Sequence, residues 1–156
     1  MRSILLIDHG SVKPEANHML VCVASLLQHM VGEGVLVRYA HMELAEPSIA
    51  AGFAACVEGG ATDVVAFPYM LSPGKHSTRD IPRMVAEAAK DFPHVTFRVT
   101  EAFGVSAQLA EVVALRAGVE IANAATEADM CRCWNGDGPV GQCGAACTGR
   151  VAESLA

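Results

Sequence analysis

The sequence predicts an α/β domain in which helices cover both faces of a mostly parallel, four-stranded sheet. Three observations carry this prediction. Short aliphatic runs typical of buried strands alternate four times with segments typical of helices. Strands that alternate with helices form parallel sheets, because each helix provides the crossover to the next strand. The 156 residues are 52% hydrophobic and 18% charged, which suffices for one hydrophobic core but not for two.

Each expected strand is a short run rich in β-branched, aliphatic or aromatic side chains. The strands are expected at residues 3–8, 35–42, 63–69 and 95–100. Apolar side chains of the first helix recur every three or four positions and stop near Gly32. The second helix opens with Pro47 and Ser48, which favour helix starts, and stops at Gly59 and Gly60. The helices are expected at residues 19–30, 47–58, 79–92 and from 105 to about 125, the last with Gly118 in its interior.

The composition changes beyond residue 125. Residues 129–150 contain four cysteines, five glycines and the only tryptophan, with no helical or strand periodicity. We therefore expect a single α/β domain at residues 1–125 and an irregular C-terminal extension at residues 126–156. The two remaining cysteines, Cys22 and Cys56, lie in apolar helical segments and are expected in the core.

The formal net charge is −6 and the basic residues are scattered, which argues against a nucleic-acid partner. A membrane span needs about 20 consecutive apolar residues, and the chain has no such run. The apolar start of the chain is interrupted by Asp8 and His9, so no secretory signal is expected and the protein is predicted to be cytoplasmic. Patterns for a dinucleotide fingerprint, a P-loop and a nucleophile elbow are all missing from the sequence.

Ligands of open parallel sheets bind beyond the carboxyl ends of the strands. His9 follows the first expected strand, Glu43 follows the second, and His76 lies in the loop beyond the third. Imidazole and carboxylate groups suit divalent iron, cobalt, nickel, copper and zinc, so two histidines and a glutamate describe a site that could hold a metal ion and release it. His41 is a weaker candidate, for which packing is favoured over a secondary metal contact. The other histidines are expected to be solvated or to cap helices.

Three motifs resemble one known family. These are His9-Gly10-Ser11, the segment Ala-His-Met-Glu-Leu-Ala-Glu-Pro-Ser-Ile at residues 40–49, and Pro73-Gly74-Lys75-His76 followed by Asp80-Ile81-Pro82. Together they resemble the short class II tetrapyrrole chelatases, which comprise sirohydrochlorin cobaltochelatases and ferrochelatases. The similarity spans about residues 1–118, and the second motif and the cysteine-bearing tail most resemble the ferrochelatases of sirohaem synthesis.

The resemblance implies a chelatase-like domain that inserts Fe²⁺, or alternatively Co²⁺, into the polyanionic ring sirohydrochlorin. It also implies that His9, Glu43 and His76 are the catalytic and metal-contacting residues, without saying which histidine is ligand and which is base. Val12 and Lys13 depart from the family, in which an arginine is expected soon after the first motif. A polyanionic ring is opposed by the net negative charge, so we expect local contacts to the substrate. The expected contacts are Ser11, Lys13, Tyr69, Lys75 and Arg79.

The tail cysteines Cys131, Cys133, Cys143 and Cys147 could ligate an iron–sulfur cluster or zinc, although the C-x₂-C spacing of zinc ribbons is missing. Resemblance favours an iron–sulfur cluster that chelation does not need. The alternatives are binding or delivery of another metal, and a tail that is redox-active or merely disordered. Longer chelatases have two lobes across a cleft, so a homodimer is expected. From a different functional class, a non-catalytic metal-binding or metal-carrier protein would also use the histidines and cysteines.

Overall fold

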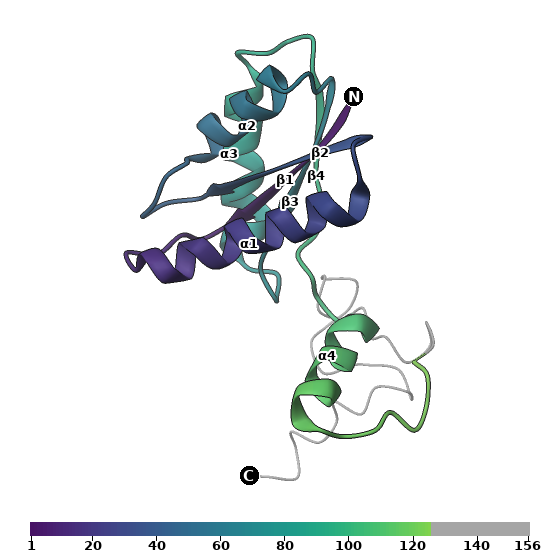
Figure 1. The fold of residues 1–156 in the computed structure, drawn as a ribbon. Helices are drawn as coiled ribbons and strands as arrows, with labels where there is room; N and C mark the ends of the chain where they lie inside the picture. Colours follow the sequence, from purple (N-terminus) through teal and green to yellow (C-terminus); the bar gives the residue numbers. More distant parts are fainter. Residues whose placement is uncertain (126–156) are drawn as a thin grey trace. The chain divides into compact units, whose positions relative to one another are not determined.

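The computed structural model describes residues 1–125 and divides into two units (Figure 1). The first, Met1–Ala102, is an α/β domain, and the second begins at Phe103 and contains helix α4. The limits of 1–125 and 126–156 expected for the domain and the extension stay a prediction. In the described part of the chain, no helix is both long enough and apolar enough to cross a membrane.

The four strands of the first unit form one sheet in the order β2-β1-β3-β4, and every neighbouring pair is parallel. The strands are β1 (Arg2–Asp8), β2 (Val35–His41), β3 (Asp63–Pro68) and β4 (Thr96–Val99). In the register of β1, Asp8 faces His41 of β2 and Ile7 faces Pro68 of β3. The carboxyl ends of three strands therefore meet at one edge of the sheet, as expected from the sequence.

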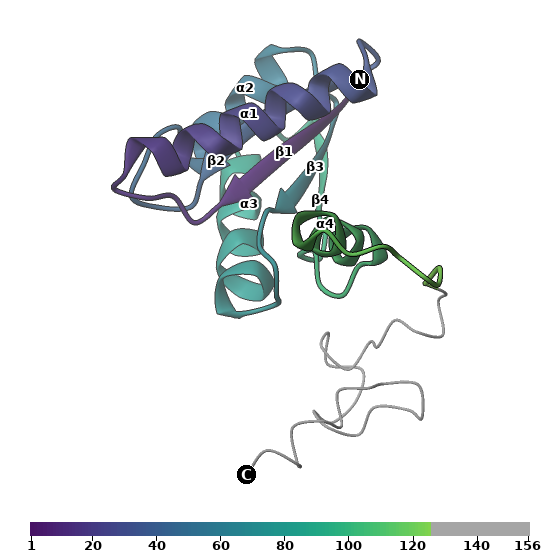
Figure 2. The same ribbon diagram turned by 60° about the horizontal axis from the view of Figure 1, so that its bottom comes forward.

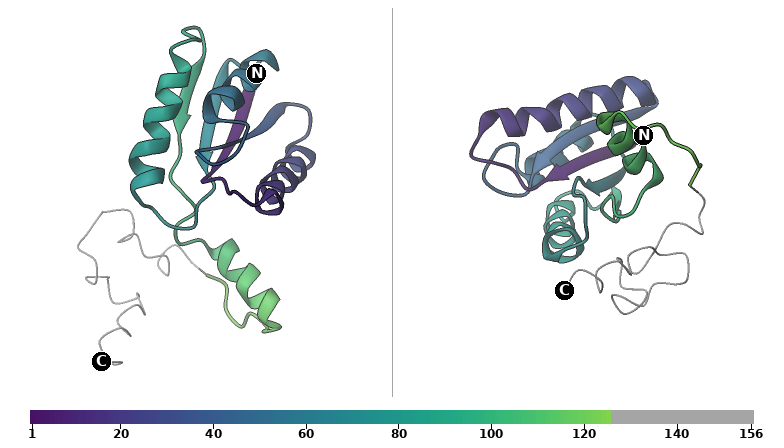
Figure 3. Two further views of the ribbon diagram at one scale, coloured as in Figure 1. Left: turned by 90° about the vertical axis from the view of Figure 1, so that its left-hand side faces the viewer. Right: turned by 90° about the horizontal axis from the view of Figure 1, so that it is seen from below.

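Helices cover both faces of the sheet, which confirms the predicted fold class. Helix α1 (Pro14–Val31) covers one face, whereas α2 (Ile49–Glu58) and α3 (Ile81–Ala89) pack together on the other. Figures 2 and 3 show α1 and α3 on opposite sides of the strands. This arrangement has three layers with the sheet in the middle.

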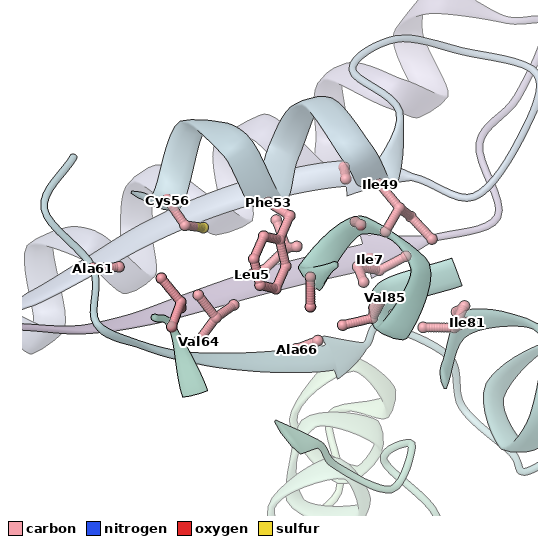
Figure 4. Packing of buried hydrophobic residues seen from close by; sticks show 14 of the residues in the cluster. Leu5, Ile7, Ile49, Phe53, Cys56, Ala61, Val64, Ala66, Ile81 and Val85 are labelled. Carbon is pink, nitrogen blue, oxygen red and sulfur yellow. The ribbon is translucent and has the colours of Figure 1, made fainter. Parts of the chain in front are cut away.

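Two hydrophobic clusters hold the layers together. The larger lies between the sheet and the α2–α3 pair, where Phe53 of α2 packs with Leu5 and Ile7 of β1 (Figure 4). The smaller lies under α1 and includes Leu6 and Leu20. Successive side chains of a strand point to opposite faces, so β1 contributes to both clusters. Each such fully buried side chain stabilises the fold by about 1.5–3 kcal/mol relative to exposure.

The helix boundaries differ from the predictions, most at the start of α1 and at the end of α4. Helix α1 begins at Pro14, five residues before the expected residue 19, because a proline at the first position and a polar first turn extend the helix ahead of its apolar stripe. A π-helical turn, His76–Asp80, precedes α3. Helix α4 (Ala107–Ala117) ends at Gly118, whose φ of 67° is left-handed, so the expected continuation to residue 125 is wrong.

The two cysteines of the described chain have different environments. Cys56 is buried, as predicted, and burial raises the pKa of its thiol, while Ser3 and Arg38 lower it by less. Cys22 is exposed, so its predicted place in the core is wrong. Its position on α1 lies outside the buried stripe that contains Leu20 and Ala24.

Candidate functional site

Main-chain hydrogen bonds bring His9 and Glu43 together beyond the ends of their strands. Asp8 is the last residue of β1, and its carbonyl accepts the N–H of Met42 at 2.8 Å. The carbonyl of His9 then accepts the N–H of Glu43 at 3.1 Å. The parallel pairing of β1 and β2 thus continues past both strands, and it places a histidine beside a glutamate at the carboxyl edge of the sheet.

Two imidazoles and one carboxylate gather at this edge. Nε2 of His9 lies 2.7 Å from Oε1 of Glu43, and the two side chains are 43% and 53% exposed. The ring centroid of His76 lies 5.3 Å from that of His9, with the ring planes at 69°. An ionised carboxylate only accepts hydrogen bonds, so the contact between His9 and Glu43 contains one shared proton. The structure therefore brings together the three residues that the sequence singled out.

His76 has an acidic neighbour on its own turn. Its Nδ1 lies 3.0 Å from Oδ2 of Asp80, whose other oxygen accepts from Nε of Arg79 at 3.3 Å. Loss of solvent around the carboxylate raises its pKa, yet the hydrogen bonds from Arg79 and His76, together with the charges of Arg79 and Lys75, hold the pKa of Asp80 below its ordinary value. Asp80 is the more sheltered partner, with 17% of its side chain exposed against 46% for His76.

A second histidine–aspartate pair lies beneath the site. Nδ1 of His41 is 2.6 Å from Oδ1 of Asp8, and the His41 side chain is 1% exposed. The same Asp8 oxygen accepts the N–H of Gly10 at 2.9 Å. This arrangement agrees with the packing interpretation of His41. It also fixes the turn that follows His9.

Gly10 is required in that turn for two reasons. Its φ of +82° is left-handed, which side chains other than glycine rarely adopt. A Cβ atom on Gly10 would overlap the carbonyl oxygen of Glu43 and lie 3.1 Å from Cβ of His41. The loops after β1 and β2 therefore touch through their backbones, at a spacing that keeps His9 and Glu43 in contact.

The expected substrate contacts beside His9 lie at the start of α1. Ser11 exchanges two hydrogen bonds of 2.8 Å with the Asn17 side chain, and its Oγ accepts the N–H of Lys13 at 3.0 Å. The side chain of Lys13 is exposed. These contacts hold the loop that leads from the site into the helix, and they leave the Lys13 ammonium facing solvent.

The other expected contacts follow β3. Lys75 and Arg79 are exposed and flank His76 in sequence. Tyr69 is half-buried and packs against the cluster under α1, while its N–H donates to the Ile7 carbonyl at 2.6 Å. The structure therefore places the basic residues at the carboxyl edge, and Tyr69 between that edge and the core.

Exposed apolar side chains lie on all three loops of this edge. Val12, Leu44 and Leu71 are 79%, 59% and 72% exposed, respectively. Leu44 directly follows Glu43 and has a left-handed φ of 66°, which costs a leucine about 1–2 kcal/mol. The carboxyl edge therefore exposes apolar side chains as well as basic ones.

Within residues 1–125, no group of three or more His, Cys, Asp or Glu side chains is placed to hold a metal ion as it stands. His9 and Glu43 are paired with each other, so a metal ion would have to replace their shared proton. The predicted cluster ligands Cys131, Cys133, Cys143 and Cys147 lie outside the described residues. The described part of the edge therefore provides two imidazoles and one carboxylate in contact with one another, without the arrangement of a closed structural metal site.

Two aspartates at the site were not among the candidate site residues, although Asp80 is part of the third motif. Asp8 directly precedes His9, and Asp80 lies four residues after His76, a spacing that brings side chains together on a helical turn. That spacing was the available signal for Asp80. No local signal pairs Asp8 with His41, because their contact depends on strand register.

A parallel α/β sheet covered by helices, with imidazole and carboxylate side chains gathered at its carboxyl edge, defines the class of this protein: an open α/β domain with a cluster of titratable groups at the ends of its strands. Comparison with protein families is more specific, because the CbiX family model matches residues 3–119. The chain belongs to the CbiX family.

Named relatives agree with this assignment. The chain is 39% identical over 128 residues to the chloroplastic sirohydrochlorin ferrochelatase of Arabidopsis thaliana, covering 82% of this chain and 56% of the relative. It is 35% identical over 116 residues to the sirohydrochlorin cobaltochelatase of Priestia megaterium, covering 74% and 37%. The sirohydrochlorin chelatase SirB of Bacillus subtilis subspecies spizizenii, solved in complex with cobalt, superposes with a TM-score of 0.69 at 28% identity, covering 75% of this chain and 50% of SirB. The chain thus spans about half the length, or less, of these relatives.

Proposed function

We propose that the chain is a sirohydrochlorin ferrochelatase, a lyase-class enzyme that inserts Fe²⁺ into sirohydrochlorin to give sirohaem. The relatives named as sirohydrochlorin chelatases support this proposal. The observation that carries it is the 2.7 Å contact of His9 with Glu43 and the His76 ring beside it. Metal insertion needs groups that bind a cation weakly and groups that accept protons, and these three side chains provide both.

The reaction exchanges one divalent cation for the two pyrrolic protons of the ring. The cation replaces the proton shared by His9 and Glu43 and loses part of its water shell to these side chains. Neutral imidazole nitrogens bind divalent iron or cobalt without the strength of thiolates, so the ion can be passed to the ring. Glu43 balances charge and relays the released protons to solvent, to which it is 53% exposed.

The edge around these residues suits a large polycarboxylate ring. The ammonium groups of Lys13 and Lys75 and the guanidinium of Arg79 offer local positive charge on a chain whose net charge is −6. Ser11 is placed to hold the loop that carries Lys13, and Tyr69 offers an aromatic edge at the end of β3. These five residues are proposed to bind the ring and its carboxylates.

Cobalt is the competing metal substrate, since a cobaltochelatase is among the relatives. The affinity order of divalent metals does not decide between Fe²⁺ and Co²⁺ in a cell, so the rates with both metals must be compared. The four tail cysteines are proposed to hold an iron–sulfur cluster that insertion does not require. Visible spectra with iron and sulfide counts on anaerobically purified Cys143→Ser and Cys147→Ser proteins test this: unchanged cluster absorbance contradicts it.

A second copy of the chain is proposed to complete the cleft. The chain covers half of SirB, and the apolar side chains of Val12, Leu44 and Leu71 are exposed beside the site. A homodimer would bring a facing wall to this edge. Light scattering on the active protein measures its mass, and a monomer with full activity contradicts the proposal.

Turnover separates an enzyme from a metal carrier. Protein at a small fraction of the sirohydrochlorin concentration is mixed with Fe²⁺ under anaerobic conditions, and metallation is followed by the absorption of the ring. An enzyme metallates many rings per chain, whereas a carrier delivers no more metal than it binds. Metallation at the rate of the protein-free mixture contradicts the proposed function. Parallel reactions with Co²⁺ and Ni²⁺ rank the metals.

A further inference from the structure

Hydrogen bonds within the π-helical turn His76–Asp80 fix the position of the His76 side chain. Ile81 donates its N–H to the His76 carbonyl, five residues back, which widens the turn relative to an α-helix. Ser77 is 5% exposed and its Oγ exchanges hydrogen bonds of 3.0 and 3.2 Å with the backbone of Gly74. The turn is thus anchored inward by Ser77, while the side chains on either side of Ser77 are exposed.

Asp80 closes the turn from the other end. Its Oδ2 lies 3.0 Å from Nδ1 of His76, and it is the better-sheltered member of the pair. Arg79 Nε holds the second carboxylate oxygen at 3.3 Å, so the carboxylate plane is fixed by two partners. A carboxylate that accepts from a ring nitrogen requires a proton on that nitrogen, and in a neutral imidazole the other nitrogen then carries the lone pair.

We infer that Asp80 is a positioning residue, which holds neutral His76 as the Nδ1–H tautomer and so keeps its Nε2 lone pair available at the site. This inference rests on the proposed function for its purpose, since either role open to His76, ligand or base, uses an unprotonated Nε2. Histidines that bind metals commonly donate their other N–H to a carboxylate in this way.

The nitrogens of His9 have a different environment. Its Nδ1 lies 3.2 Å from the carbonyl oxygen of Gly10 and its Nε2 lies 2.7 Å from Oε1 of Glu43, so each nitrogen faces an acceptor. Among the described residues, His76 has one such contact, at Nδ1, and it is made by one replaceable side chain, Asp80.

Nitrogen NMR of the full chain tests the inference without reference to activity. The ring nitrogens of His76 are assigned by their loss in His76→Gln and compared, above the pH at which the imidazole becomes neutral, in the parent, Asp80→Ala and Asp80→Asn. The parent should have Nδ1 protonated, and Asp80→Ala should shift the population toward the Nε2–H tautomer. Asp80→Asn should keep the Nδ1–H tautomer, because its amide oxygen still accepts. Glu87→Ala, which removes an exposed carboxylate of α3 that pairs with Lys90, is the matched control and should change nothing.

Metal affinity gives a second readout. Asp80→Ala should weaken Co²⁺ binding about 10–100-fold, the usual effect of losing such a partner, and Asp80→Asn should recover part of it. A parent His76 with Nε2 protonated, or an unchanged tautomer in Asp80→Ala, overturns the inference. If the tautomer changes as expected but the parent metallates no sirohydrochlorin, the proposed function fails and the positioning role stands. If the parent metallates sirohydrochlorin but His76 keeps its tautomer in Asp80→Ala, the proposed function stands and the positioning role of Asp80 fails.

Discussion

Replacing Gly10 by alanine should damage the site and the fold together. The left-handed φ of Gly10 adds a strain of about 1–2 kcal/mol for any L side chain. The new methyl group also overlaps the Glu43 carbonyl oxygen, and overpacking of this kind costs about 1–3 kcal/mol. The free energy of unfolding should therefore fall by roughly 2–5 kcal/mol. The backbone carbonyl that must move belongs to Glu43, so the contact between His9 and Glu43 should open as well.

Alanine substitutions at two other glycines measure backbone strain and steric overlap separately. Gly32 has a φ of 70° and a ψ of −163°, a backbone conformation that is essentially restricted to glycine, and a Cβ there would meet no atom within 4 Å. Gly32→Ala should therefore show backbone strain alone, about 1–3 kcal/mol. Gly52 has no left-handed φ, but a Cβ there would lie 2.8 Å from Cβ of the core residue Ala40, and none of the three nearest atoms belongs to His9, Glu43 or His76. Gly52→Ala should therefore destabilise the protein by overpacking without altering metal insertion.

Urea unfolding and anaerobic metallation are the assays, with rates measured where each variant is still folded. Gly10→Ala should lose more stability than Gly32→Ala and should be the only one of the three that is slow per folded molecule. The reasoning is refuted if Gly10→Ala unfolds like Gly32→Ala and metallates at the parent rate, because the overlap with Glu43 would then have no consequence.

Further predictions concern charges and thiols elsewhere in the α/β unit. His41→Phe preserves the ring volume but removes the partner of a sheltered carboxylate, so urea unfolding should show a loss of about 1–3 kcal/mol, and an unchanged stability contradicts the buried pair. The hydrogen bond from Arg2 lowers the pKa of Asp63, so this group stabilises the fold above the unfolded pKa of about 4, and the contribution is lost as pH falls through the folded pKa. Asp63→Asn should therefore cost less than about 1 kcal/mol at pH 7 and nothing near pH 2, a difference readable from thermal melts at the two pH values. In native protein, iodoacetamide should label exposed Cys22 and spare Cys56, whose pKa is raised by burial, and equal labelling in mass spectra would count against that burial.

The layered fold was predictable because it follows from local patterns. Alternating aliphatic runs and amphipathic segments need only short-range information, and the resulting parallel topology follows from the crossover rule. Helix ends were less predictable. Gly118 can lie inside a helix or cap one, and only its left-handed φ distinguishes the two. Similarly, the apolar stripe of α1 marks the buried face and not the polar first turn at Pro14.

The site was predictable in its residues but not in their pairing. Ligands of open parallel sheets bind beyond the carboxyl ends of the strands, and this rule predicted that His9, Glu43 and His76 lie at one edge. The distances between their side chains depend on main-chain pairing beyond β1 and β2, which the rule does not give. Register also decides that His41 pairs with Asp8, a contact between residues 33 positions apart in sequence. Such contacts have no local signature.

The rate of Fe²⁺ insertion into sirohydrochlorin by histidine variants tests the central claim most directly. His29, exposed on α1, provides the matched control. After subtraction of the protein-free rate, His9→Ala and His76→Ala should each lose at least about 10²-fold, the scale expected for removal of a proton acceptor, while His29→Ala keeps the parent rate. Folding of each variant is confirmed by its unfolding transition. Insertion by His9→Ala and His76→Ala at the parent rate would contradict the assignment of metal insertion to this edge of the sheet.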